Sequence, residues 1–186
     1  MDDNLIFNVA QLLKEPVGAT RSATVVADVY RLVPELAKSD VPTAVERPEL
    51  SGRIRLMLTG DGILAQGDLS AELTLPCSRC LEPVVVPIDV ELEEVFTPTI
   101  DVITGQAIKP EEDDRALWID EHHILDLSEV LRQDVLVAVP MHPVCREDCR
   151  GLCSTCGQNL NEGSCNCAPE PDPRWASLAA LLNQNE

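Results

Sequence analysis

The chain has 186 residues, 45% of them hydrophobic, which is enough for one domain with a small appendage. Its 32 acidic and 14 basic side chains give a net charge of -18, and phosphate binding depends on Lys and Arg, so unaided contact with nucleic acid or an anionic membrane is disfavoured. This charge favours a basic protein partner. The absence of a signal-like start and of a run of roughly 18 apolar residues predicts a cytoplasmic protein without a membrane span.

The first third of the chain gives mixed signals. The apolar pattern of residues 5–13 combines strand and helix periods and predicts a short strand followed by a helical turn. Residues 24–33 are rich in Val and Thr and contain Tyr30, a composition that predicts a strand. Residues 34–48 contain three prolines and predict a loop, with a helical turn at 35–38.

The middle of the chain alternates clearly between apolar and polar residues. Residues 54–58, the turn chemistry of residues 59–62 and the apolar pair that follows predict a hairpin. Further strands are predicted over 67–75 and 84–95, each with one apolar face. The pair Cys77 and Cys80 lies between these two strands, so we expect it at the tip of a β-hairpin.

The rest of the first domain is predicted to be an acidic loop over residues 97–115, two short strands within 116–125 and a helix. Asp126 or Ser128 is placed to cap this helix, and Pro140 and Pro143 end it. Residues 169–186 predict a linker and a short terminal helix. The expected fold is α+β, with a mainly antiparallel β-sheet and one long helix in residues 1–144, a cysteine-rich zinc module in 145–168 and the terminal segment 169–186.

Six of the eight cysteines fall within residues 145–167, interleaved with Gly and Asn. In a reducing compartment such density indicates metal ligands rather than disulfides. Zinc binds four thiolates in a tetrahedron, and a Cys-x-x-Cys-Gly turn is a recurrent way to supply two of them. The sequence therefore predicts one local zinc site formed by Cys153, Cys156, Cys165 and Cys167.

The remaining four cysteines predict a second zinc site, which would join the hairpin tip to the end of the helix: Cys77, Cys80, Cys145 and Cys149. An alternative grouping places Cys145, Cys149, Cys153 and Cys156 on one ion and leaves the upstream pair alone. A third possibility is a single site or a mixture that includes His142.

Catalytic patterns are sparse in this sequence. Cys77-x-x-Cys80 has the spacing of a redox dithiol, but such a pair works at a helix N-terminus, whereas this one joins two predicted strands. His122 and His123 stand in an acidic stretch and are interpreted as solvated side chains. With no Gly-rich phosphate loop either, we expect a protein that is not an enzyme.

The cysteine-rich string is the most distinctive feature of the chain. Residues 77–83 read Cys-Ser-Arg-Cys-Leu-Glu-Pro, and residues 149–161 read Cys-Arg-Gly-Leu-Cys-Ser-Thr-Cys-Gly-Gln-Asn-Leu-Asn. With Cys165-Asn-Cys167 and the opening residues 7–13, this string resembles the YceD family, the large ribosomal RNA subunit accumulation proteins.

The resemblance implies a non-enzymatic factor in large-subunit biogenesis, needed for accumulation of 23S rRNA. The implied partner is a precursor of the large ribosomal subunit or a basic ribosomal protein, with RNA stabilised indirectly. Alternatively, Arg79, Arg146 and Arg150 would form a small basic spot that contacts RNA directly. Two other classes remain open, a zinc-dependent interaction adaptor unrelated to the ribosome and a dithiol oxidoreductase.

Overall fold

The computed structural model describes residues 4–38, 47–109, 115–167 and 174. Its strands are β1 (Ile6–Asn8), β2 (Thr20–Asp28), β3 (Glu49–Leu58), β4 (Ile63–Pro76), β5 (Pro83–Pro98), β6 (Trp118–Ile119) and β7 (Ile124–Asp126). Its α-helices are α1 (Val29–Leu32) and α2 (Ser128–Ala138), and its 3-10 turns are η1 (Leu12–Lys14), η2 (Leu36–Lys38) and η3 (Arg115–Leu117). The linker and terminal helix expected over residues 169–186 fall outside the described residues, Arg174 apart.

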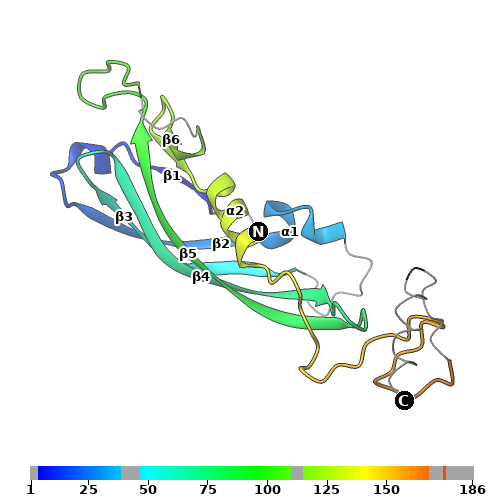
Figure 1. The fold of residues 1–186 in the computed structure, drawn as a ribbon. Helices are drawn as coiled ribbons and strands as arrows, with labels where there is room; N and C mark the ends of the chain where they lie inside the picture. Colours follow the sequence, from blue (N-terminus) through cyan, green and yellow to red (C-terminus); the bar gives the residue numbers. More distant parts are fainter. Residues whose placement is uncertain (1–3, 39–46, 110–114, 168–173, 175–186) are drawn as a thin grey trace, which may run out of the picture.

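The fold is α+β, as expected, and is built on a five-stranded sheet in the order β2-β3-β4-β5-β6 (Figure 1). All its pairings are antiparallel except the short one between β5 and β6, and β1 and β7 form a separate two-stranded ribbon. Within the described residues, no helix is long and apolar enough to cross a membrane.

The sheet has one covered face and one open face. Because side chains alternate along a strand, Leu56, Leu69 and Val90 are buried on the covered face, whereas neighbours such as Arg55, Asp68 and Glu91 are exposed. Helix α2 contributes Val130, Leu131 and Val135 to the same core. Neither Asp126 nor Ser128, the predicted caps, is the N-cap of α2: that position is Leu127, which makes no side-chain cap hydrogen bond. The Asp126 carboxylate instead accepts a hydrogen bond from the backbone N–H of Ser128, two residues on, in a local turn before the helix. The apolar alternation thus placed the core correctly.

The strand predicted over residues 24–33 ends earlier than expected. The chain turns into α1 at Val29, and the Asp28 side chain accepts hydrogen bonds from the N–H groups of Tyr30 and Arg31. An N-cap of this kind satisfies the free donors of a first helical turn. The Asp28 cap therefore overrides the strand preference of Val and Tyr at these positions.

Strand β4 runs without interruption through Gly67, where the sequence suggested that a new strand begins. A Cβ at Gly67 would lie 2.5 Å from the carbonyl oxygen of Arg53, and a Cβ at Gly52 would meet the carbonyl oxygen of Asp68. Glycine is needed at both positions because β3 and β4 approach too closely for a side chain. Strands β4 and β5 consequently form a hairpin of 14 and 16 residues that reaches the cysteine-rich region (Figure 1).

Candidate metal centres

The tip of the β4–β5 hairpin forms a tight turn that brings Cys77 and Cys80 together, as the sequence predicted. The N–H of Cys77 donates to the carbonyl of Glu82, and the N–H of Leu81 donates back to the carbonyl of Cys77. Leu81 takes a left-handed conformation with φ 63° to close this turn. The turn places both thiols on one side of the hairpin.

The chain leaving α2 returns to this tip. The N–H of Ser78 donates a 2.7 Å hydrogen bond to the carbonyl of Pro143, and the N–H of Cys145 lies 3.4 Å from the sulfur of Cys77. Residues 145–149 then fold over the turn. We call the resulting group the hairpin cluster: Cys77, Cys80, Cys145 and Cys149.

Sulfur–sulfur distances test whether the hairpin cluster fits a metal. The Sγ atoms of Cys77 and Cys149 are 3.9 Å apart, those of Cys80 and Cys145 are 3.7 Å apart, and all four lie within 4.8 Å of one another. A tetrahedron with Zn–S bonds of about 2.3 Å has sulfur–sulfur edges of about 3.8 Å. The spacing is too long for a disulfide and matches the edge of a tetrahedral thiolate site.

Burial and hydrogen bonds act in opposite directions on these thiols. Burial raises the pKa of Cys77, but the backbone N–H groups of Cys80, Arg79 and Cys145 outweigh it and bring the pKa to about 6. Burial raises the pKa of Cys80 to about 12. One sulfur is therefore prepared as a thiolate while its neighbour holds a proton, which a bound cation would displace.

The second group forms within one local segment. Cys153 and Cys156 lie in a turn in which the N–H of Gly157 donates to the carbonyl of Cys153, and Gly157 has φ 74°. Opposite them lies the Cys-x-Cys pair near residue 166. We call this group the loop cluster: Cys153, Cys156, Cys165 and Cys167, with sulfurs within 4.8 Å of one another.

The loop cluster differs from the hairpin cluster in exposure. None of its cysteines is buried, whereas Cys77, Cys80 and Cys149 of the hairpin cluster are. Backbone N–H groups of Cys156 and Thr155 lower the pKa of Cys153 to about 6. Hydrogen bonding with Cys156 raises the pKa of Cys167 to about 12. Like the hairpin cluster, the loop cluster thus combines a thiol of lowered pKa with one of raised pKa, but its sulfurs are more accessible to solvent.

The structure places the eight cysteines in the first of the groupings considered from the sequence. It does not bring together the four of the alternative grouping, and it places neither His142 nor any other histidine in a group of metal-ligand type among the described residues. The hairpin pair also faces two further sulfurs rather than a helix N-terminus, an arrangement unlike that of a redox dithiol. Each cluster offers a closed set of four sulfur donors, which suits a structural metal ion.

Three polar side chains hold the clusters together: Arg79, which the sequence suggested only as part of a basic spot, and Asn159 and Asn161, which sequence reasoning did not select. Arg79 donates from Nη1 to the carbonyl oxygens of Glu147 and Cys149, at 3.1 and 3.0 Å. Asn159 and Asn161, both between the ligands of the loop cluster, donate to Glu82 and to the sulfur of Cys149 respectively. The only available sequence signal was their position inside the cysteine string.

The arginines expected to form a basic spot are largely engaged inside the protein. Arg79 binds backbone carbonyls, and Arg146 contacts both Asp148, at 3.3 Å, and Asn161, at 2.8 Å. The described contacts of Arg150 involve its backbone N–H. Much of the positive charge beside the clusters therefore has partners within the chain.

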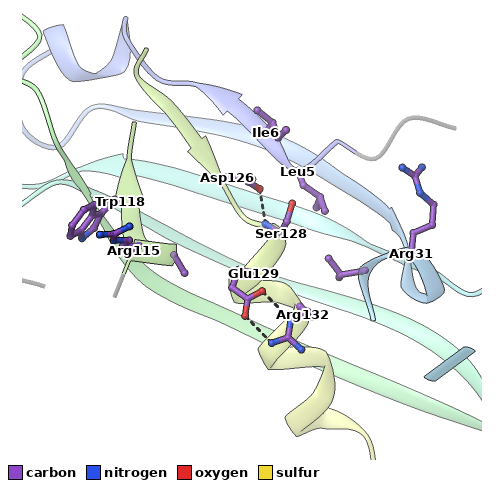
Figure 2. A pocket seen from close by; sticks show the side chains of 11 residues that line it. Leu5, Ile6, Arg31, Arg115, Trp118, Asp126, Ser128, Glu129 and Arg132 are labelled. Atoms are coloured by element: carbon purple, nitrogen blue, oxygen red, sulfur yellow. Dashed lines mark hydrogen bonds and ion pairs between the residues drawn. The ribbon is translucent and has the colours of Figure 1, made fainter. Parts of the chain in front are cut away.

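A separate hollow of about 650 Å³ lies away from the clusters, between α1, α2, η3 and the β1–β7 ribbon (Figure 2). In its lining, Arg132 forms an ion pair with Glu129 at 2.8 Å, and the guanidinium of Arg115 lies 5.7 Å from the centre of the Trp118 ring. Hydrogen bonds from Arg132 and Gln133 lower the pKa of Glu129 to about 2. This carboxylate stays ionised and is poorly suited to exchange protons at neutral pH.

The chain is similar to several known proteins. The sequence profile described as large ribosomal RNA subunit accumulation protein YceD matches residues 65–182. An uncharacterized protein of Mycobacterium tuberculosis is 35% identical over 69% of this chain, and the match spans 60% of the length of that relative. One from Mycobacterium leprae is 26% identical over 96% of this chain and 77% of its own length. No solved structure matches the chain.

A plant relative carries a more informative name. The Zea mays protein called large ribosomal RNA subunit accumulation protein YCED homolog 1, chloroplastic, is 29% identical over 71% of this chain and 50% of its own length. The fold and its clusters define an α+β protein with two four-cysteine groups able to hold metal ions. With the profile covering most of its length, the chain belongs to the YceD family.

Proposed function

We propose that this protein is a non-enzymatic factor in biogenesis of the large ribosomal subunit, needed for accumulation of 23S rRNA in the cytoplasm. The observation that supports the proposal is the family match over residues 65–182, which spans the β4–β5 hairpin and both cysteine clusters. The name of the Zea mays relative agrees with it. Since the chain spans 60% of the Mycobacterium tuberculosis relative, its partners are inferred from its own surface.

Two structural zinc ions are part of this proposal. The hairpin cluster and the loop cluster each offer four thiol sulfurs at a spacing that zinc fits, and neither includes a position for water or substrate. Zinc would supply cross-links and no reaction chemistry. In the hairpin cluster it would join residues 77–80 to residues 145–149, which are far apart in the sequence, and so add to the hydrogen bonds between these segments.

The proposed partner is a basic protein of the precursor particle, with rRNA stabilised indirectly. The open face of the sheet supports this choice, because Asp89, Glu91 and Glu93 project from β5 with all three side chains exposed. In the register of the sheet, Glu91 of β5 pairs with Asp68 of β4, and Asp68 pairs in turn with Arg53 of β3. Acidic rows of this kind attract Lys-rich and Arg-rich segments and repel the phosphate backbone.

Co-sedimentation with precursor particles tests the proposal. The tagged full chain is expected in the large-subunit precursor fractions of a low-salt sucrose gradient, and its depletion is expected to lower the ratio of 23S to 16S rRNA. Absence from those fractions, with rRNA unchanged on depletion, would reject the ribosomal role and favour an adaptor elsewhere.

Charge reversal then separates protein-mediated association from direct RNA contact. We expect Glu91→Lys/Glu93→Lys to remove the chain from the precursor fractions and Arg146→Glu/Arg150→Glu to leave it there. The opposite pattern would place RNA, rather than a basic protein, next to the clusters. Zinc content measured on all variants checks that neither pair of changes disturbs the metal centres.

A further inference from the structure

In the sequence, Asn161 lies between ligands of the loop cluster, but its side chain contacts the hairpin cluster. It lies between Cys156 and Cys165, yet its side-chain nitrogen Nδ2 donates to the sulfur of Cys149 at 3.3 Å. These residues are 12 positions apart, and the contact is partly buried. A side chain held between the ligands of one cluster thus completes the surroundings of the other.

The orientation of this amide is determined by its oxygen. The Oδ1 atom of Asn161 accepts a 2.8 Å hydrogen bond from the backbone N–H of Arg150 and another of 2.8 Å from Nη2 of Arg146. Both donors flank Cys149 or Cys145 in the sequence. With the oxygen engaged by two donors, the NH2 group is the part of the amide that faces sulfur.

Hydrogen bonds to ligand atoms change how strongly a site holds its metal. Four thiolates around a divalent cation carry a net negative charge, and this chain already has a charge of -18. An N–H donor aimed at one thiolate stabilises that charge, and loss of such a partner typically lowers metal affinity about 10–100-fold. The donor from Asn161 therefore bears directly on the affinity of the hairpin cluster.

The position of Asn161 depends in turn on the loop cluster. Residues 157–164 contain no helix or strand and are held by a few bonds, among them Leu160 N–H to Gly151 carbonyl at 2.9 Å and Asn161 N–H to Asn159 Oδ1 at 3.0 Å. A metal ion bound by the cysteines on both sides of this segment would close it into a short loop. Closure removes conformations in which Asn161 points away from Cys149.

We propose that Asn161 couples the two clusters, so that metal bound at the loop cluster raises the affinity of the hairpin cluster for its own metal. The coupling is reciprocal, because linkage between two binding equilibria acts equally in both directions. Asn161 is a positioning residue in this scheme and is not itself a ligand. The inference rests on the proposed binding of metal at both clusters.

The test compares zinc affinities of the hairpin cluster in the full chain by competition with a chromophoric chelator. Asn161→Asp keeps the oxygen that Arg146 and Arg150 bind and removes the donor to sulfur. We expect about 10–100-fold weaker zinc binding at the hairpin cluster. Asn166→Asp adds the same charge between Cys165 and Cys167, where the described residues show no side-chain hydrogen bond, and is expected to leave that affinity unchanged.

A variant that lacks the loop cluster provides a second test of the coupling. Cys156→Ser/Cys165→Ser leaves only the hairpin cluster, whose affinity should fall by a similar factor. Adding Asn161→Asp to this pair should then change the affinity by less than about threefold, because the donor has already lost its support. Fully additive losses, or an unchanged affinity in Asn161→Asp, would overturn the proposal.

Cobalt substitution gives a readout that a purely structural role would not move. Loss of the N–H donor should shift the sulfur-to-cobalt charge-transfer band of the hairpin cluster to lower energy in Asn161→Asp and leave it in place in Asn166→Asp. If the double cysteine variant does not fold, Asn161→Asp carries the test by itself, since it changes no ligand. A chain that binds no zinc would reject the proposed metal centres, whereas two ions bound independently would reject only the coupling.

Discussion

Glu82 and Asn159, 77 positions apart in the sequence, are joined by a 2.8 Å hydrogen bond from Nδ2 of Asn159 to Oε1 of Glu82. The other carboxylate oxygen, Oε2, lies 3.9 Å from the sulfur of Cys80, which donates to it. Glu82 therefore connects the hairpin tip to the loop that carries the second cluster. The two clusters are held against each other by side chains as well as by the peptide chain between them.

Replacing Glu82 should loosen the contact between the clusters without removing a ligand. In Glu82→Ala the amide of Asn159 loses its partner, and we expect residues 150–164 to be cleaved faster in limited proteolysis. Glu147→Ala is a suitable control, because the described contact of Glu147 uses its backbone carbonyl. Equal cleavage rates in the two variants would contradict a bridging role for Glu82.

Zinc stoichiometry should report the two clusters separately. We expect two ions in the wild-type chain, one in Cys80→Ser and one in Cys156→Ser, since each change removes one of four donors from a different group. Native mass spectrometry together with elemental analysis measures this directly. If Cys80→Ser retained two ions, Cys80 would not be a ligand and the grouping by distance would be wrong.

Alanine substitutions at two glycines of the cysteine-rich region can distinguish the cost of backbone strain from the cost of a close packing contact. Gly151 and Gly157 have φ of 71° and 74°, so alanine at either costs about 1–2 kcal/mol of conformational energy. A Cβ at Gly151 would also lie 3.0 Å from the carbonyl oxygen of Arg79, whereas a Cβ at Gly157 meets nothing within 4 Å. Gly151→Ala should therefore lower the free energy of unfolding more, as measured by denaturant titration of the zinc-loaded chain. Equal losses would mean that the contact with Arg79 adjusts freely.

The ion pair at the start of α2 should produce a defined acid dependence. The pKa of Glu129 is lowered from its model-compound value of 4.5 to about 2, so its contribution to stability is present above pH 4.5 and is lost as the pH falls toward 2. In thermal unfolding, the advantage of the wild type over Glu129→Gln should shrink across this window. An advantage of the wild type that stayed constant between pH 4.5 and pH 2 would contradict a stabilising role for this ionised carboxylate.

The sequence predicted most of the sheet because one of its faces is buried. Alternation around Leu56, Leu69 and Val90 identified β3, β4 and β5, and the pair Cys77 and Cys80 was placed correctly at the hairpin tip. The error at Val29 arose because strand propensity was weighed without the cap offered by Asp28. Propensity is a weak guide where a single side chain can satisfy a helix terminus.

The grouping of the cysteines was predictable, but their surroundings were not. Spacing and turn chemistry allowed the two groups to be proposed, since eight thiols divide into two tetrahedral sites of four. The contacts of Arg79, Glu82 and Asn161 depend on how residues 139–144 bring the chain back to the hairpin, which no local pattern encodes. The parallel pairing of β5 with β6 likewise arises from tertiary contacts.

The length of the β4–β5 hairpin limits the distance between the cysteine-rich region and the part of the sheet that is covered by α2. Fourteen paired residues of β4 span about 45–50 Å at about 3.4 Å per residue. Because side chains alternate with a period of two, adding or removing one residue in each strand would turn Cys77 to the opposite side of the hairpin. The reach of this arm can therefore change only in steps of about 7 Å, two residues per strand at a time.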